Sequence, residues 1–186
     1  ITLIHKGKNL PRETLANWRP ITLLNTDYKI LAKILARRMN KVIEKIVDQD
    51  QCGFIKGRNI ATILRTTEDV ITYLNHKHLP GILLAVDYTK AFDTLSKKLI
   101  LDSLQKFGLG PDFTQWVKTL ISETESCINH YGWLSESFPL ERGIRQGCPF
   151  SPLLFLLAVE IFATKIRHGE IKGITIRNHT HKTTIK

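Results

Sequence analysis

The feature that most constrains the fold of this chain is a short apolar run that ends in an aspartate. Residues 82–86, ILLAV, follow the turn signal Pro80-Gly81 and are followed directly by Asp87. A continuous apolar run of this length, bounded by a turn, is typical of a strand that is buried on both faces. Catalytic and metal-binding acids often follow the carboxyl end of such a strand. The run therefore predicts a buried strand with Asp87 at the edge of a site, although an aspartate that only caps the next turn is the commoner outcome.

Helical and strand-like patterns alternate along the rest of the chain. Apolar residues recur at three- and four-residue spacing and predict helices over residues 31–46, 60–74, 96–107, 111–121 and 151–168. Strand-like patterns occupy residues 1–7, 18–25 and 82–86, with hairpins within 126–143 and 172–186. Because strands and helices are interleaved, we expect an α+β fold.

Charge indicates the kind of partner. The 186 residues carry a formal net charge of +10, and residues 1–58 hold 12 Lys/Arg against 5 Asp/Glu. A basic region of this kind suits a polyanion such as nucleic acid, although an acidic membrane surface or a merely solvated face remains open. No apolar run approaches the ~20 residues that span a bilayer, so we expect no membrane-spanning segment.

Cysteine usage and the start of the chain indicate its origin. Cys52, Cys127 and Cys148 are odd in number and far apart, which favours reduced thiols of an intracellular protein over disulfides or a zinc site. The chain begins without Met inside a strand-like pattern, and it lacks the basic-then-apolar start of a signal peptide. We expect it to be a fragment of a longer polypeptide.

A second polar constellation is the segment RGIRQGCPFSPLLF, residues 142–155. Gly143 and Gly147 allow the backbone to approach a ligand closely, and Arg145 and Gln146 add hydrogen-bond donors. The helix that follows opens near this loop, and helix N-termini suit phosphate groups. A turn before a helix explains the glycines and prolines but not the Arg-Gln pair, so both interpretations stay open from the residues alone.

Two further segments combine arginine or lysine with aromatic residues. WRPITLLN, residues 18–25, contains Arg19, and DQCGFIKGR, residues 50–58, contains Lys56 and Arg58. Basic side chains beside aromatic rings suit phosphate contacts and base stacking. Each segment is a weak signal by itself.

In this order, the segments resemble the fingers and palm of a reverse transcriptase of the non-LTR (LINE-like) retrotransposon type. The segments NWRPITLLNTDYKILAKILARRM and DQCGFIKGRNIATIL resemble the fingers blocks, whereas AVDYTKAFDTL and FPLERGIRQGCPFSPLLFLLAVE resemble two successive palm blocks. IKGITI matches the segment before the catalytic hairpin. Among other families, group II intron maturases are a nearer alternative than retroviral enzymes, which share the scheme but lack these motifs. The resemblance implies a right-hand polymerase fold, with a fingers region over 1–80 and an incomplete palm over 81–186, in which helices pack on a mixed or antiparallel sheet.

The resemblance also implies two-Mg²⁺ transfer of deoxynucleotides to a primer 3′-hydroxyl. Asp87 matches the palm aspartate that holds both ions, and the carbonyl of Tyr88 would add a ligand. Phe92 matches the bulky ring that lies under the incoming sugar and excludes a 2′-hydroxyl. Asp93 matches no metal ligand and is expected to brace the next segment.

Nucleotide and template positions follow from the same resemblance. The nucleotide-binding residues are Arg19, Lys29, Phe92, Gln146 and Gly147. The residues for the template backbone are Lys56, Arg58 and Arg145. The implied partners are an RNA template, a DNA primer or target and deoxynucleoside triphosphates, with no obligate protein partner evident. The implied location is the nucleus and cytoplasmic ribonucleoprotein.

One expected part of the family's site is absent from the sequence. The second acidic block, Tyr/Phe-Ala-Asp-Asp, would follow IKGITI, whereas the chain reads THKTTIK there. Glu160 lies between apolar residues and is expected to pair helices rather than to replace that block. We therefore expect that the chain alone does not polymerise DNA. A nucleic-acid-binding remnant of a decayed element remains the alternative.

Overall fold

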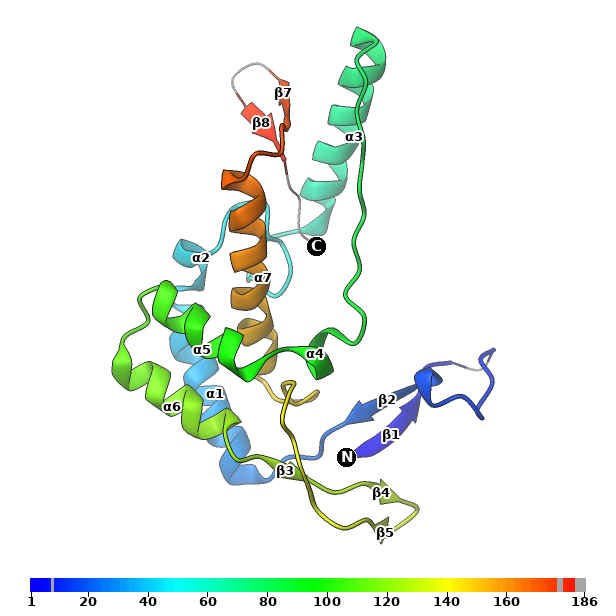
Figure 1. The fold of residues 1–186 in the computed structure, drawn as a ribbon, viewed down its shortest axis with the longest axis vertical. Coiled ribbons are helices and arrows are strands. Elements are labelled where there is room, and N and C mark those ends of the chain that lie inside the picture. Colours follow the sequence, from blue (N-terminus) through cyan, green and yellow to red (C-terminus); the bar gives the residue numbers. More distant parts are fainter. Residues whose placement is uncertain (8, 177–178, 183–186) are drawn as a thin grey trace.

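The protein is described by a computed structural model that covers residues 1–7, 9–176 and 179–182. The long helix α7 lies at the centre, with the other helices arranged around it (Figure 1). The helices are α1 Thr26–Asn40, α2 Ile43–Ile46, α3 Ile60–Lys77, α4 Ala91–Thr94, α5 Lys97–Lys106, α6 Pro111–Ile121 and α7 Ser151–His168. No helix in these described ranges is both long and apolar enough to cross a membrane.

The helix α7 is central because it is apolar around most of its circumference. It buries nine residues and packs against α5 and α4. Phe150, just before the helix, is completely buried and forms an edge-on ring contact with Phe113 of α6. The core also includes Met39 of α1 and Leu104 of α5. The sequence prediction of a helix from residue 151 to about residue 168 is confirmed.

The helix predicted over 31–46 is two helices in the structure. The α1 helix ends at Asn40, and α2 begins at Ile43. Between them, the β-branched Val42 leaves the helical region with φ −122° and ψ −17°. The turn still places Ile43 in the core, at 1% exposure. The apolar spacing thus predicted the buried face correctly, while the interruption depended on the backbone of Val42.

Within the part of the chain that the structure describes, the strands form one mixed sheet and two small ribbons. The sheet has the order β2-β1-β4-β5, with β1 antiparallel to β2 and parallel to β4. Its strands are β1 Thr2–His5, β2 Trp18–Ile21, β4 Asn129–His130 and β5 Trp133–Leu134, and the short 3-10 helix η1 Leu15–Asn17 precedes β2. The ribbons pair β3 Glu125–Ser126 with β6 Phe138–Pro139, and β7 Ile174–Ile176 with β8 His179–His181. Both predicted hairpins are therefore confirmed within the described residues.

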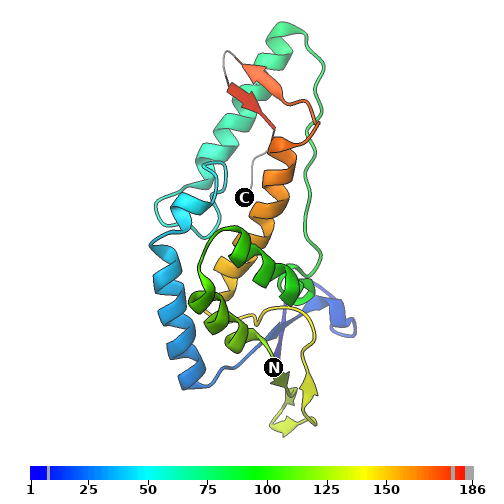
Figure 2. The same ribbon diagram turned by 60° about the vertical axis from the view of Figure 1, so that its left-hand side comes forward.

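The predicted buried strand over residues 82–86 is wrong. The segment is extended along α3 but has no strand assignment, and Ile82 and Leu84 are 93% and 80% exposed (Figure 2). The reason is that no other strand in the described ranges pairs with it, and an isolated strand cannot satisfy its backbone groups or cover its apolar side chains. The apolar run predicted a strand that would pair and be buried, but both pairing and burial depend on partners that these residues do not supply.

Candidate active site

Asp87 lies in the extended segment just before α4. Asp87 is exposed, and its carboxylate has no hydrogen-bond or ion-pair partner among the described residues. The next residue, Tyr88, anchors the segment to α7 through edge-on ring contacts with Phe155 and Phe162, at centroid distances of 5.8 and 6.5 Å. Partial burial raises the pKa of Tyr88. Asp87 is thus held next to α7 while its carboxylate stays accessible.

Phe92 on α4 forms the adjoining wall. Its ring stacks on Phe155 of α7, with centroids 5.3 Å apart and an angle of 22° between the planes. Stacking of this kind fixes the ring orientation and adds to the stabilisation from area burial. Phe92 is only half-buried. An accessible, immobilised ring close to Asp87 in sequence can act as a steric wall for a ligand.

The glycine-containing loop after Arg142 is pinned to the segment around α4. The amide of Ile144 donates to the Phe92 carbonyl, and the amide of Gly143 donates to the Leu95 carbonyl, both at 2.8 Å. Gly143 has φ +84°, and a Cβ there would lie 2.7 Å from the Asp93 carbonyl oxygen. Only glycine fits this conformation and this contact without strain. The two segments that resemble successive palm blocks therefore touch along their backbones.

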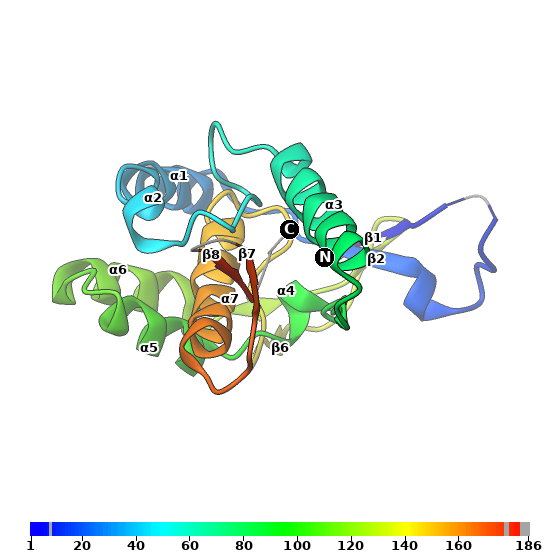
Figure 3. The same ribbon diagram turned by 90° about the horizontal axis from the view of Figure 1, so that it is seen from above.

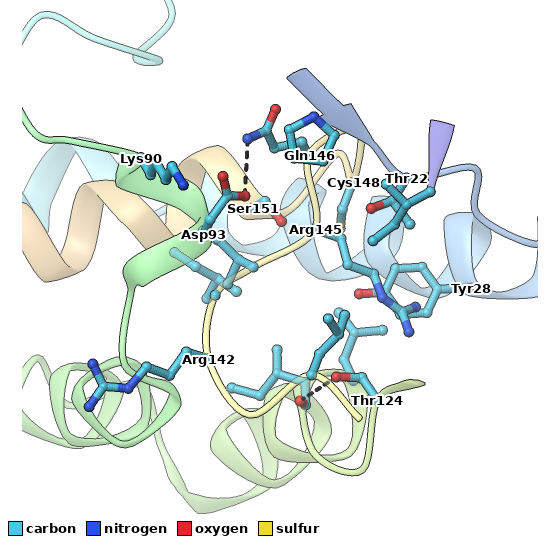
Figure 4. A pocket seen from close by; sticks show the side chains of 18 residues that line it. Thr22, Tyr28, Lys90, Asp93, Thr124, Arg142, Arg145, Gln146, Cys148 and Ser151 are labelled. Carbon is cyan, nitrogen blue, oxygen red and sulfur yellow. Dashed lines mark hydrogen bonds between the residues drawn. The ribbon is translucent and has the colours of Figure 1, made fainter. Parts of the chain in front are cut away.

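Gln146 is oriented by Asp93. The Gln146 side-chain nitrogen donates to the Asp93 carboxylate at 3.1 Å (Figure 4). An ionised carboxylate only accepts hydrogen bonds, so this contact requires the amide nitrogen, not the oxygen, to face Asp93. The backbone of Gln146 is also held, because its carbonyl accepts from the Thr22 amide at 3.0 Å. Asp93 was expected to brace the next segment of the chain, whereas its carboxylate accepts from Gln146, 53 positions further along, a contact that no pattern in the sequence indicated.

A cavity of about 320 Å³ lies beside this loop, lined by residues from β2, α1, α4, α6 and the loop itself (Figure 4). Asp93, Arg145 and Gln146 line it together with Lys90 and Arg142, so basic groups outnumber the single carboxylate. The predicted residues Asp87, Arg19 and Lys29 are not among its lining residues. The structure thus brings two of the predicted side chains, Gln146 and Arg145, into one cavity.

Arg145 is packed inside this cavity and makes contacts within the protein. Its guanidinium lies 4.8 Å from the centre of the Tyr28 ring, and one terminal nitrogen donates to the Glu125 carbonyl at 3.2 Å. Its Nε atom is buried and has no hydrogen-bond partner among the described residues. Burial, reinforced by Cys148, raises the pKa of Tyr28, and the Arg145 charge opposes this increase. The prediction that Arg145 contacts a template backbone stays untested.

The residues predicted for the nucleotide and template lie on several elements. Arg19 is exposed on β2 and is paired with Ile4 of β1. Lys29 is exposed on α1. Gly147 has φ +99°, and a Cβ added there would lie 3.1 Å from the Thr22 carbonyl oxygen. Lys56 is exposed in the loop after α2. These positions leave the three basic side chains accessible to a charged ligand.

Arg58 instead closes the loop between α2 and α3. Its guanidinium donates to the carbonyls of Asp48, Gln51, Glu44 and Val47, with a distance of 2.7 Å to Gln51. Three of these carbonyls lie at or just after the end of α2, where helical carbonyls lack partners. A charged donor at a helix C-terminus is favourable. The predicted template contact of Arg58 is untested, but its hydrogen bonds show that it shapes the loop that carries Lys56.

Sequence reasoning missed an ion cluster that ties this loop to α7. Arg167 pairs with the carboxylates of Glu160, Asp50 and Asp48, the last two at 3.0 and 3.5 Å. The Glu160 side chain is 3% exposed. Burial raises the pKa of Glu160, whereas the Arg167 charge and the amide of Asp48 lower it. Glu160 and Arg167 are seven residues apart, which places them on the same face of the predicted helix. This spacing was the sequence signal that could have indicated their ion pair.

The described residues show no group of three His, Cys, Asp or Glu side chains that could hold a metal ion. The donors of Asp87 and Tyr88 are oxygen atoms, which suit Mg²⁺ chemically. One carboxylate and one carbonyl are nevertheless too few for two ions. The described residues alone therefore do not fit a two-metal centre.

Comparison with known proteins identifies the family. Residues 4–179 match the family model "Reverse transcriptase (RNA-dependent DNA polymerase)". The chain is 34% identical over 164 residues to the Xenopus laevis "Transposon TX1 uncharacterized 149 kDa protein", covering 88% of this chain and 12% of that protein. It is 34% identical over 145 residues to the Drosophila melanogaster Pol polyprotein from type-2 retrotransposable element R2DM, covering 77% and 13%, respectively. A Popillia japonica Pol polyprotein from type-1 retrotransposable element R2 is 30% identical over 155 residues, which cover 83% of this chain and 21% of that protein. The chain spans a small part of these relatives, and it belongs to the reverse transcriptase family of non-LTR retrotransposons.

Proposed function

We propose that the chain forms the fingers region, residues 1–80, and the first part of the palm, residues 81–186, of an RNA-directed DNA polymerase. The observation that carries the proposal is the contact between the segment after Asp87 and the loop that contains Gln146. Backbone hydrogen bonds from Ile144 and Gly143, and the side-chain bond between Gln146 and Asp93, join these segments. Two segments about 50 residues apart that resemble successive palm blocks thus build one site.

Within that site, each side chain has a role that suits its chemistry. The immobilised ring of Phe92 would lie against the sugar of an incoming deoxynucleotide and exclude a 2′-hydroxyl. Gln146, held through its amide nitrogen, leaves its amide oxygen and a second N–H for the ligand. Gly147 permits close backbone approach. Arg19, with Lys29, would contact the triphosphate, where charge-assisted hydrogen bonds are strong.

The template would lie against the loop after α2. Lys56 is the accessible cation of that loop, and Arg58 holds the loop through backbone carbonyls. An exposed lysine can neutralise a phosphate and release a counterion on binding. Arg145 would act on the template side from within the cavity. RNA is the proposed template and DNA the proposed primer.

Asp87, with the carbonyl of Tyr88, would supply part of the Mg²⁺ coordination in the whole protein. Bound Mg²⁺ stabilises the attacking and leaving oxygens of phosphoryl transfer. Since the described residues do not complete a two-metal centre, the remaining carboxylates would come from elsewhere in the longer protein. The chain by itself is therefore proposed to be inactive in DNA synthesis.

The exposed extended segment supports a palm that is completed by further strands. Ile82, Leu84 and Val86 are 93%, 80% and 62% exposed, and their backbone has no strand partner in the described ranges. A run of this kind is stable only when neighbouring strands pair with it and cover it. We propose that the longer protein places those strands against residues 82–86, which would bring their side chains next to Asp87.

Primer extension tests the proposal directly. The chain and the longer natural protein are compared on an RNA template with a DNA primer, deoxynucleotides and Mg²⁺. We expect incorporation only by the longer protein, and we expect Asp87→Ala to abolish it. Asp102→Ala, at an exposed aspartate on α5, is the matched control and should retain incorporation. Undiminished incorporation by Asp87→Ala, or Asp87-dependent incorporation by the chain alone, would contradict the proposed division of the site.

A further inference from the structure

The outer surface of α1 carries a row of basic side chains. The helix buries Ala32, Leu35, Ala36 and Met39 against the core. Away from these residues lie Lys29, Lys33, Arg37 and Lys41, the last of which caps the helix C-terminus. These four residues, here called the α1 basic row, are spaced four residues apart. Successive charges are therefore separated by about 6 Å along the helix axis, and the row is about 18 Å long.

No described residue neutralises the charges of the α1 basic row. All four residues are exposed, and their side chains have no hydrogen bond or ion pair with any other described residue. Arg38, beside the row, is also exposed, and its side chain has no hydrogen bond or ion pair with any other described residue. Like charges four residues apart on a helix repel one another by a few tenths of a kcal/mol per pair. An anionic ligand would relieve this repulsion.

Lys33, Arg37 and Lys41 of the α1 basic row lie apart from the candidate active site, whereas Lys29, in the first turn of the helix, is also proposed to contact the triphosphate. In the views of Figures 1 and 3, α1 lies on one side of the central helix α7, and α4 lies on the other. Asp87 lies four residues before α4, next to Tyr88, whose ring contacts α7. A polyanion on α1 would be bound in addition to the nucleic acid at the catalytic side.

We infer that Lys33, Arg37 and Lys41 of the α1 basic row bind the phosphate backbone of RNA outside the catalytic site, an inference that rests on the proposed polymerase function. A regular row of exposed cations suits the regular charge of a nucleic-acid backbone, and contacts of this kind dominate affinity without reading sequence. A membrane is disfavoured because the outer face offers only Ile30 and Ile34, 53% and 45% exposed, as apolar groups for insertion. An acidic protein surface would lack the regular spacing that matches the row.

Salt-dependent RNA binding by the chain tests this inference. The variant Lys33→Gln/Arg37→Gln/Lys41→Gln removes three charges of the row, and glutamine keeps a similar helix propensity. The matched control, Lys98→Gln/Lys106→Gln/Lys118→Gln, removes three charges at exposed positions of α5 and α6. Both proteins therefore have the same net charge, and circular dichroism verifies that both remain helical. The probe is a single-stranded RNA, with binding measured by fluorescence anisotropy at several salt concentrations.

The slope of log K against log[salt] is expected to become shallower by roughly 2 in the α1 variant, since three phosphate contacts are lost at about 0.7 each. The control is expected to keep the wild-type slope. Equal slopes in the two variants, or an α1 variant that binds like the wild type, would overturn the inference and leave the polymerase proposal standing. A wild-type chain that does not bind RNA would overturn both. Anionic vesicles are the second probe, and a loss of vesicle binding without a loss of RNA binding would also overturn the inference.

Discussion

Replacing Arg167 by methionine should strongly destabilise the protein, because the substitution leaves a buried carboxylate without its cation. Arg167 pairs with Glu160, whose side chain is 3% exposed, and with Asp50 and Asp48, whose side chains are 19% and 46% exposed. Methionine keeps an unbranched apolar stem about as long as the aliphatic part of the arginine side chain. The substitution therefore removes the charge and the hydrogen bonds while it limits the change in packing.

The exposed fractions decide which pair controls the magnitude. The half-exposed Asp48 contributes less than about 1 kcal/mol, as is usual for a pair in contact with water. Glu160 belongs to the buried class, in which loss of one partner costs about 3–5 kcal/mol. We expect Arg167→Met to lower the free energy of unfolding by about 3 kcal/mol. A second substitution, Glu160→Gln, should recover at least ~1 kcal/mol of this loss, because it removes the stranded charge.

Urea denaturation at several pH values is the assay. Burial raises the folded-state pKa of Glu160 above the ordinary value of 4.5. A raised pKa stabilises the folded protein fully below the ordinary pKa, and this contribution is lost as pH rises through the folded-state pKa. Removing Arg167 removes a group that lowers this pKa. The destabilisation by Arg167→Met should therefore be larger at pH 7 than at pH 4. Arg38→Met, at an exposed arginine of α1, is the control and should change stability by less than about 0.5 kcal/mol. A loss below about 1 kcal/mol in Arg167→Met, or no dependence on pH, would refute the reasoning.

Three further substitutions test the loops that shape the site. Arg58→Met should cost about 2 kcal/mol in urea denaturation, because hydrogen bonds to a charged donor are lost and carbonyls near the end of α2 lose their partner; equal stability would show that water replaces the guanidinium. Gly143→Ala should lower the free energy of unfolding by about 1–3 kcal/mol, since φ is +84° and the added Cβ would lie 2.7 Å from the Asp93 carbonyl oxygen. Gly108→Ala is the control that separates backbone strain from this clash, because Gly108 has φ +69° and an added Cβ would meet nothing within 4 Å. Asp93→Ala should raise the KM for deoxynucleotides in the longer protein more than Asp93→Asn does, because asparagine still accepts from Gln146; identical KM values would contradict the positioning role of Asp93.

The helices were predictable because their residues alternate between core and solvent with a local period. The predicted starts of α6 and α7, at Pro111 and Ser151, are confirmed, and Ser96 caps α5 by accepting from the Leu99 amide at 3.4 Å. These features depend on side chains within a few positions of one another. The family was also predictable, because the order of its blocks is a property of the sequence alone, and residues 4–179 match it.

The site was only partly predictable. Asp93 was expected to brace a segment, but its contact with Gln146 spans 53 positions and follows from how the loop folds onto α4. Arg58 and Lys56 are both basic residues of the segment 50–58, and the sequence predicted the same template contact for each. The Arg58 guanidinium is nevertheless directed to backbone carbonyls, whereas Lys56 is exposed. A basic residue in a loop can face inward or outward, and the neighbouring backbone decides which.

The amino-acid sequence by itself determined the helical faces, the hairpins, the basic first third and membership in the reverse transcriptase family. All of these are local patterns or ordered motifs. Only the tertiary structure decided that residues 82–86 remain uncovered, because burial of a strand requires partners that are distant in sequence. It also decided that the Gln146 loop meets the segment after Asp87, and that Arg167 joins α7 to the loop before α3. Contacts of this kind follow from packing in three dimensions, which no short window of sequence contains.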